Sequence, residues 1–221
     1  MITLWHCSDA RSFRPLWALE ELGLDYELKM LPFPPRFRAR EYLAENPLGT
    51  IPLLVDGETR MTESAAIVEY LAAKYRPDGP LAVRPDEPGF GAYLNALHFG
   101  EATLTFPQTL VLRYSRLEPP ERRQPGVADD YAKWFLARLR GLEAVLETSD
   151  HVAADRFTVA DISVAYALLL AETLGLAEKF PPRVAAYWAR MQRREGFQRA
   201  KAAQARASET QGLKAVPLGD L

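Results

Sequence analysis

The hydrophobic pattern of the chain changes completely near residue 76, and this change constrains the fold more than any single motif. Strand-like and helix-like patterns alternate over residues 1–75, whereas only helical patterns follow from about residue 93. The stretch between them, 76–88, is rich in Pro, Gly and Asp and has no periodicity, which is typical of an interdomain linker. At 221 residues the chain is long enough for two domains. We therefore expect four segments: an α/β domain over 1–77, a linker over 78–88, an all-helical domain over 89–206 and a tail over 207–221.

The first domain is expected to open with a strand, a helix and a second strand. Residues 2–6 form a short apolar run, and residues 26–30 alternate apolar and charged side chains, so both predict strands. Between them, leucines recur at helical spacing over 13–22, with Pro15 fitting the first turn and Gly23 fitting the stop. A strand, helix and strand within so few residues predict a βαβ unit with parallel strands.

The rest of this domain shows a short helix, a hairpin and a longer helix. Residues 41–45 favour a short helix after a loop rich in proline and arginine. Asp56-Gly57 between two extended runs is a strong hairpin signal. A helix then begins near Thr62-Glu63-Ser64 and runs to Tyr75. The expected order is βαβ-α-ββα.

The second half predicts helices only, and one of them has a recognisable start. Thr158 and Asp161, three residues apart before an apolar run, have the form of a capping box, with Asp in place of the usual Glu. The expected helices span about 90–115, 128–147, 158–174 and 181–194.

Composition narrows the classes of function. The net charge of -2 gives no reason to expect nucleic acid or an anionic membrane surface as a partner. The single cysteine, Cys7, excludes an intramolecular disulfide and favours the cytoplasm. No apolar run approaches the roughly 18 residues of a membrane span, and the first residues lack the pattern of a signal peptide. We expect neither a metal nor a membrane partner.

Two short motifs suggest a ligand site, although each has an ordinary structural explanation. Ile51-Pro52 at the start of a strand places a backbone N–H and C=O where an extended peptide can pair with them; alternatively, Pro52 is a trans proline of an edge strand. Ser64 and the first N–H groups of its helix suit a carboxylate, and Glu63 suits an amine. Alternatively, Thr62 or Ser64 is simply an N-cap.

Together these motifs resemble the glutathione transferase family, in its bacterial cytosolic form. The resemblance rests on Asn46-Pro47-Leu48-Gly49 before Pro52, on Glu63-Ser64-Ala65-Ala66-Ile67 after it, and on the helical second half with its capping box. It implies a thioredoxin-like first domain, a cis proline at Pro52, and glutathione as co-substrate. By position, the glutathione-binding residues would be Thr50, Ile51, Pro52, Glu63 and Ser64.

The residue that activates the glutathione thiol is less well marked. Family members place a Tyr, Ser or Cys near the first strand–helix junction, and many have a serine four or five residues before the position of Arg14; those positions here are Ala10 and Asp9. Cysteine-type members have their cysteine where Arg11 stands. We take Ser12 as the first catalytic candidate, Ser8 as the second and Arg11 as an electrostatic aid. Ser12 also fits the N-cap of the first helix, and we expect Cys7 to be buried.

The family resemblance implies transfer of glutathione to a small hydrophobic electrophile, in detoxification, by a homodimer. The acceptor site would use the first helix of the second domain, with Phe99, Phe106, Arg113 and Tyr114 as candidates; each also fits a core stripe. Two alternatives stay open. One is glutathione-dependent isomerisation, as in maleylacetoacetate isomerase, or peroxide reduction. The other is a non-catalytic binding or scaffold role on the same fold.

Overall fold

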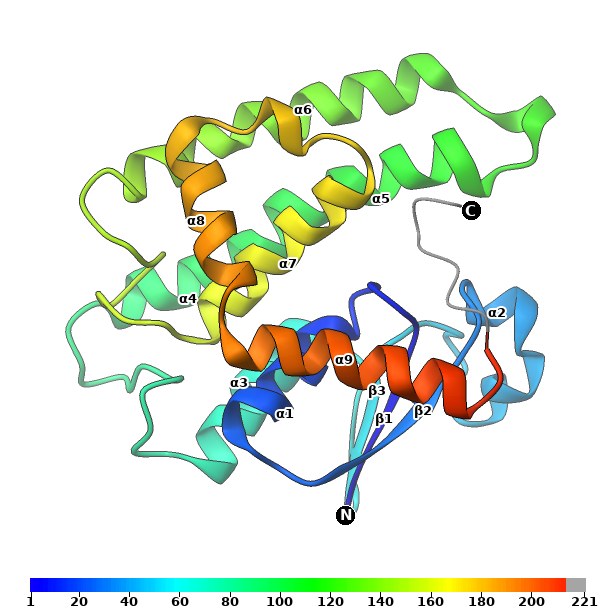
Figure 1. Ribbon diagram of the computed structural model, residues 1–221, viewed down its shortest axis with the longest axis horizontal. Coiled ribbons are helices and arrows are strands. Elements are labelled where there is room, and N and C mark those ends of the chain that lie inside the picture. Colours follow the sequence, from blue (N-terminus) through cyan, green and yellow to red (C-terminus); the bar gives the residue numbers. More distant parts are fainter. Residues whose placement is uncertain (214–221) are drawn as a thin grey trace. The chain divides into compact units, whose positions relative to one another are not determined.

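The chain forms two compact units, seen in a computed structural model that describes residues 1–213 (Figure 1). Among the described residues, one unit contains 1–79 and 193–213, and the other contains 80–192. The expected fold class, a thioredoxin-like α/β domain followed by an all-helical domain, is confirmed. Along the described residues, no helix has the length and apolar character needed to cross a membrane.

The first unit is built on a four-stranded sheet with the order β2-β1-β3-β4. β1 pairs in parallel with β2 and antiparallel with β3, which pairs antiparallel with β4. Its elements are β1 (Ile2–His6), α1 (Phe13–Leu22), β2 (Tyr26–Met30), α2 (Pro35–Arg38), η1 (Arg40–Ala44), β3 (Leu53–Asp56), β4 (Thr59–Met61), α3 (Ser64–Tyr75) and α9 (Glu195–Thr210). In Figure 1, α1 and α3 lie to one side of the strands and α2 to the other.

The βαβ opening and the hairpin form as the sequence predicts. α1 ends at Gly23, which adopts the left-handed conformation with φ 63° and donates its N–H to the Leu19 carbonyl. Gly57 and Glu58 make the turn between β3 and β4, and Asp56 and Thr59 are the pair that closes it. Leu4 of β1 lies opposite Leu28 on one side and Leu54 on the other, so the centre of the sheet is apolar.

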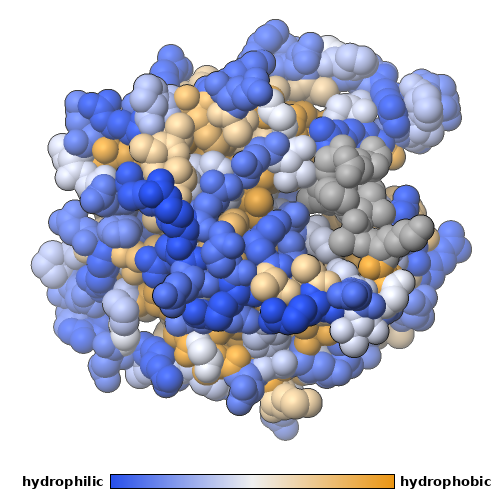
Figure 2. Space-filling view, viewed as in Figure 1, coloured by the Kyte–Doolittle hydropathy of each residue, from blue (hydrophilic) through white to orange (hydrophobic). Residues whose placement is uncertain are grey.

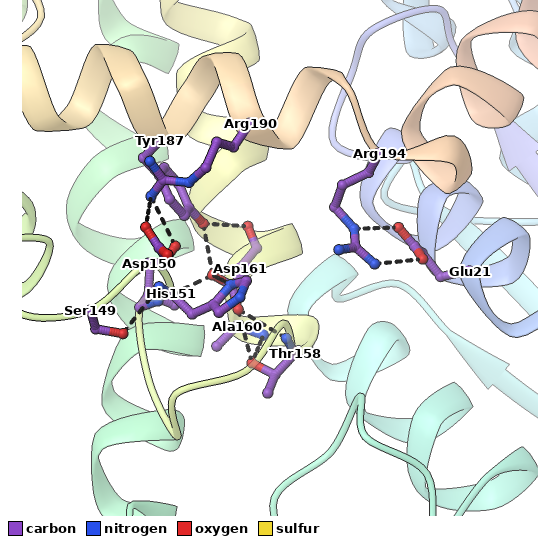
Figure 3. Close-up of polar contacts among 11 residues, drawn as sticks. Glu21, Ser149, Asp150, His151, Thr158, Ala160, Asp161, Tyr187, Arg190 and Arg194 are labelled. Atoms are coloured by element: carbon purple, nitrogen blue, oxygen red, sulfur yellow. Dashed lines mark hydrogen bonds and ion pairs between the residues drawn. The ribbon is translucent and has the colours of Figure 1, made fainter.

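Helix α9 belongs to the first unit, which differs from the expected domain boundary at 206. Phe197 makes edge-on ring contacts with Phe13 and Trp17 of α1, at centroid distances of 5.3 and 5.1 Å. Arg194, just before the helix, makes two hydrogen bonds to the carboxylate of Glu21 (Figure 3). The tail expected over 207–221 is helical to Thr210, and its part beyond 213 lies outside the described residues.

The second unit contains helices throughout its described elements. They are α4 (Phe90–His98), η2 (Phe99–Thr105), α5 (Phe106–Leu112), η3 (Arg113–Leu117), η4 (Pro120–Arg122), α6 (Pro125–Val145), α7 (Val159–Thr173), η5 (Ala177–Lys179) and α8 (Pro182–Gln192). The helix expected over 90–115 is one continuous run, but two of its stretches, η2 and η3, are wound as π-helix.

Helix α7 is the core of the second unit, with 13 of its 15 residues buried. Its N-terminus carries the expected capping box: Thr158 Oγ1 accepts from the Ala160 N–H at 3.2 Å, and Asp161 Oδ2 accepts from the Thr158 N–H at 2.9 Å (Figure 3). Close packing against η2 requires Gly100, because a Cβ there would lie 2.5 Å from Ser163 Oγ.

Candidate functional site

The loop before Pro52 is held in one conformation by its own polar side chains. The Thr50 carbonyl accepts hydrogen bonds from the Tyr42 hydroxyl and from Asn46 Nδ2, each at 2.8 Å. Asn46 Oδ1 also accepts from the Leu48 N–H at 3.1 Å. Asn46 is buried, so its amide satisfies backbone groups that would otherwise lack partners. The Asn46-Pro47-Leu48-Gly49 motif therefore builds a rigid entry to β3.

Gly49 is the one position of this loop that cannot carry a side chain. Its φ is +60°, and a Cβ would lie 2.6 Å from Arg36 Cβ and 3.2 Å from Arg36 Cα. Both the backbone conformation and the close approach of α2 therefore require glycine. The loop is thus fixed from two sides, by Asn46 within it and by α2 next to it.

Ile51 lies immediately before the sheet begins. The Ile51–Pro52 peptide bond is cis, as the family resemblance implies. The paired register starts at Leu53, which lies opposite Trp5 of β1, so Ile51 precedes the paired residues. Ile51 and Pro52 are buried, whereas Thr50 is exposed.

Ser64 is the first residue of α3 and is joined to α1 by a buried arginine. Arg14 Nη1 donates to Ser64 Oγ at 2.9 Å, and both side chains are buried. Because the serine oxygen accepts this bond, its own proton stays available to donate. Glu63 precedes Ser64 as an exposed, extended residue whose carbonyl accepts the Ile67 N–H at 2.9 Å. The start of α3 therefore places a cation, a hydroxyl and helix N–H groups together, beside an exposed carboxylate.

The loop after β1 carries the three catalytic candidates in different surroundings. Ser12 is completely buried; its hydroxyl accepts from the Cys7 N–H at 3.2 Å and lies 3.4 Å from the Cys7 carbonyl. Although Ser12 occupies the N-cap position of α1, its side chain makes no cap hydrogen bond. Ser8 and Arg11 are partly exposed. The Ser12 hydroxyl therefore links the two ends of the loop by bonding to the backbone of Cys7, whereas Ser8 and Arg11 keep exposed surface.

Cys7 is buried, as expected, and burial raises the pKa of its thiol well above the ordinary value of 9.0. A thiol held in this protonated state is a poor nucleophile at neutral pH. Over residues 1–213, no group of three or more His, Cys, Asp or Glu side chains is placed to hold a metal ion.

The acceptor candidates all lie on the long helical run of the second unit. Phe99 begins η2, Phe106 begins α5, and Arg113 and Tyr114 begin η3. Phe106 exposes 55% of its surface, the most of any large apolar side chain described in this unit. Arg113 pairs with Glu118 at 2.8 Å, and its guanidinium lies over the ring of Tyr114, with 5.4 Å to the centroid.

Comparisons with known proteins decide the family. Residues 1–73 match the family model described as glutathione S-transferase, N-terminal domain, and residues 117–195 match the corresponding C-terminal domain. The chain belongs to the glutathione S-transferase family. Glutathione S-transferase GstB of Escherichia coli K12 is 34% identical over 171 residues, which cover 75% of this chain and 80% of that relative.

Solved glutathione transferases share the fold over almost the whole chain. URE2P6 of Phanerochaete chrysosporium, in complex with oxidized glutathione, superposes with a TM-score of 0.81 at 28% identity and covers 94% of this chain and 97% of that one. Ure2p5 of the same organism, cocrystallized with 1-(S-glutathionyl)-2,4-dinitrobenzene, gives a TM-score of 0.80 at 25% identity, with coverage of 94% and 96%. The similarity to these transferases favours glutathione transfer as the function of this chain over the isomerase, peroxidase and scaffold alternatives.

Proposed function

We propose that this glutathione transferase binds glutathione along the first unit, from the start of α3 past Ile51 to the loop after β1, and transfers its thiolate to a hydrophobic electrophile. The observation that carries the proposal is the buried hydrogen bond from Arg14 to Ser64 at the start of α3. A buried guanidinium next to a helix N-terminus favours the binding of an anion there. The α-carboxylate of glutathione's γ-glutamyl end matches that site.

The two ends of the γ-glutamyl group would be held by neighbouring residues. The Ser64 hydroxyl and the first free N–H groups of α3 would donate to the carboxylate, and Arg14 would strengthen the field there. The exposed carboxylate of Glu63 would accept from the ammonium group. A charge-assisted hydrogen bond of this kind contributes about 1.5–3 kcal/mol.

The cysteinyl part of glutathione would lie against Ile51. A backbone N–H and C=O placed just before a strand can bind an extended peptide as a further strand would. Because Tyr42 and Asn46 already hold the Thr50 carbonyl, the backbone of Ile51 would be ordered before the ligand arrives. Ordering in advance lowers the entropic cost of binding.

The glutathione sulfur would then lie near the loop after β1. Ser8 is our proposed hydroxyl donor to the thiolate, and Arg11 is the proposed cation, because both keep exposed surface. The N-terminus of α1 adds a favourable dipole. Ser12, the first candidate from the sequence, would act on the thiolate only through the shape of the loop, since its hydroxyl is bonded to Cys7.

The electrophile would bind on the helical run of the second unit. We propose Phe99 and Phe106 as its apolar contacts, with Arg113 and Tyr114 at the end of the site. The cocrystallized dinitrobenzene conjugate of Ure2p5 supports an aromatic electrophile as the first acceptor to test.

We further propose a homodimer that works in the cytoplasm in detoxification. Phe37 and Leu48 each expose 65% of their surface in the first unit, an apolar surface that a second subunit would cover. Light scattering should give the mass of two chains, and a mass of 24.8 kDa would refute the dimer.

Steady-state kinetics with glutathione and chlorodinitrobenzene test the proposal. Glu63→Gln should raise the KM for glutathione by about tenfold, because one ion pair with the ammonium group is lost. Glu58→Gln is the matched control: it removes an exposed carboxylate from the hairpin and should leave that KM unchanged. An equal KM in both variants, or no turnover by the wild-type chain, would contradict the proposed site.

A further inference from the structure

We infer that Gln204 of α9 is a positioning residue for the loop that activates the glutathione thiolate. The inference rests on the proposed function, since it concerns the loop over residues 7–12 that carries Ser8 and Arg11. It adds an element that the sequence motifs do not mark, because α9 lies about 190 residues further along the chain.

The contacts converge on Asp9, the central residue of the loop. Gln204 Nε2 donates to Asp9 Oδ1 at 2.7 Å, and Gln204 Oε1 accepts from the Asp9 N–H at 3.2 Å. Lys201 Nζ also donates to Asp9 Oδ1 at 2.7 Å. The backbone and the side chain of one loop residue are thus both held by the same helix.

Asp9 needs this support because its backbone is in the left-handed region, with φ 53°. Aspartate adopts this region more readily than most residues, but it is still less favourable than the right-handed regions, so contacts from the surroundings help to hold it. The residue before Asp9 also contacts α9: Ser8 Oγ lies 3.4 Å from Ser208 Oγ, one helical turn beyond Gln204. The orientation of the proposed donor Ser8 therefore depends on α9.

His6 closes the network from the strand side. Burial lowers the pKa of His6 to about 4, outweighing the opposing effect of its hydrogen bond to Gln204, so the ring is neutral at physiological pH. The carboxylate of Asp9 accepts only, which turns the Gln204 amide N–H₂ toward it and the amide oxygen toward His6. His6 Nε2, 2.9 Å from that oxygen, therefore carries the ring proton and donates it.

The buried face of α9 carries polar side chains where they contact β1 and the loop after it. Gln204 and Ser208 are almost fully buried, although both are polar, and each is directed at β1 or the loop after it. The side of α9 that faces the viewer in Figure 2 is largely hydrophilic, in keeping with exposed residues such as Arg199 and Arg206. A helix that served only to cover the sheet would bury apolar side chains at these two positions.

The test compares two glutamines of the same helix region. Gln204→Leu removes the network, while Gln211→Leu removes a glutamine that accepts from the Met30 N–H at 2.9 Å and donates to the Leu28 carbonyl at 2.8 Å, away from the loop. Gln204 is buried and Gln211 is exposed, so the stability of both variants is measured by thermal unfolding and only the activity of the folded chains is compared. Activity with glutathione and chlorodinitrobenzene is measured against pH in the full-length chain.

The inference predicts that Gln204→Leu lowers kcat by about tenfold or more while the KM for glutathione changes by less than about threefold. The acid limb of the pH profile should move up by about one unit, because the thiolate loses stabilisation. Gln211→Leu should keep the wild-type profile. An unchanged profile in folded Gln204→Leu, or the same shift in Gln211→Leu, would overturn the inference.

A milder pair of variants covers the case in which Gln204→Leu does not fold. Lys201→Met removes one donor to Asp9 from a side chain that is partly exposed, and Lys201→Arg keeps the charge. Lys201→Met should move the profile in the same direction, and Lys201→Arg should restore it. An unchanged profile in Lys201→Met would count against the network. A wild-type chain that does not bind glutathione would instead refute the proposed function.

Discussion

Replacing Asp161 with alanine should destabilise the second unit more than any change to an exposed charge near it. The Asp161 side chain is completely buried. One carboxylate oxygen accepts from the Thr158 N–H at 2.9 Å, and the other accepts from the Val152 N–H at 3.1 Å and from the Tyr187 hydroxyl at 3.0 Å (Figure 3). Alanine removes all of these acceptors at once and leaves buried donors behind.

The size of the effect follows from these contacts. A buried donor left unsatisfied costs about 1–3 kcal/mol and a lost helix cap about 1 kcal/mol, so we expect a loss of about 4 kcal/mol in the free energy of unfolding. For a chain of this length the loss corresponds to a fall in Tm of about 8–16 °C. The N-terminus of α7, which enters the core of the unit, would lose its cap.

The neighbouring ion pair provides the control. Asp150 pairs with Arg190 at 3.3 Å, but its side chain is 81% exposed. Exposed pairs contribute little, so Asp150→Ala should cost about 0.5 kcal/mol or less. Differential scanning calorimetry on both variants gives the comparison. Equal Tm values for Asp161→Ala and Asp150→Ala would refute the reasoning that burial and hydrogen bonding set the cost.

Three further predictions test separate parts of the first unit. Because burial raises its pKa, Cys7 should react with a thiol reagent at pH 8 far more slowly in the folded chain than in urea; equal rates would refute this. Burial alone would raise the pKa of Asp56, but hydrogen bonds, led by the one from Lys74, hold this pKa below the ordinary 3.8. The extra stability of the wild-type chain over Asp56→Asn should therefore be present at pH 7 and shrink as the pH falls below 3.8. Urea unfolding across pH measures this difference in stability, and a difference that stays constant would contradict the prediction. Gly49→Ala should cost roughly 2 kcal/mol more than Gly57→Ala, since only the former meets Arg36, and equal urea midpoints would count against the clash.

The sequence predicts the first unit well where local chemistry and packing agree. The helix over 13–22 has leucines at helical spacing, a proline in its first turn and a glycine at its end, and its bounds match α1. Asp56-Gly57 likewise has one favoured use, as a turn between strands. The pair Glu63-Ser64 lies at the start of α3 as expected, since the helix signal and the ligand signal fall on the same residues.

Other features depend on contacts that no local pattern contains. Helix α9 buries Gln204 and Ser208 beside Phe197, Ala200 and Ala203, so apolar residues mark only part of its buried face. The partners of Phe197, which are Phe13 and Trp17, are distant in sequence. Arginine is a residue type that is usually exposed on a helix, but Arg14 is buried and bonded to Ser64. Ser12 has a typical N-cap residue type, yet a backbone partner in the preceding loop competes for its hydroxyl.

Calorimetric titration of the wild-type chain and of Ser64→Ala with glutathione tests the central claim most directly. The account predicts saturable binding of glutathione at millimolar concentration or below, and an affinity about tenfold weaker in Ser64→Ala, because one hydrogen bond to the glutathione carboxylate is lost. Heats that do not saturate for the wild-type chain, or an unchanged affinity in Ser64→Ala, would contradict the assignment of the α3 N-terminus as the glutathione site.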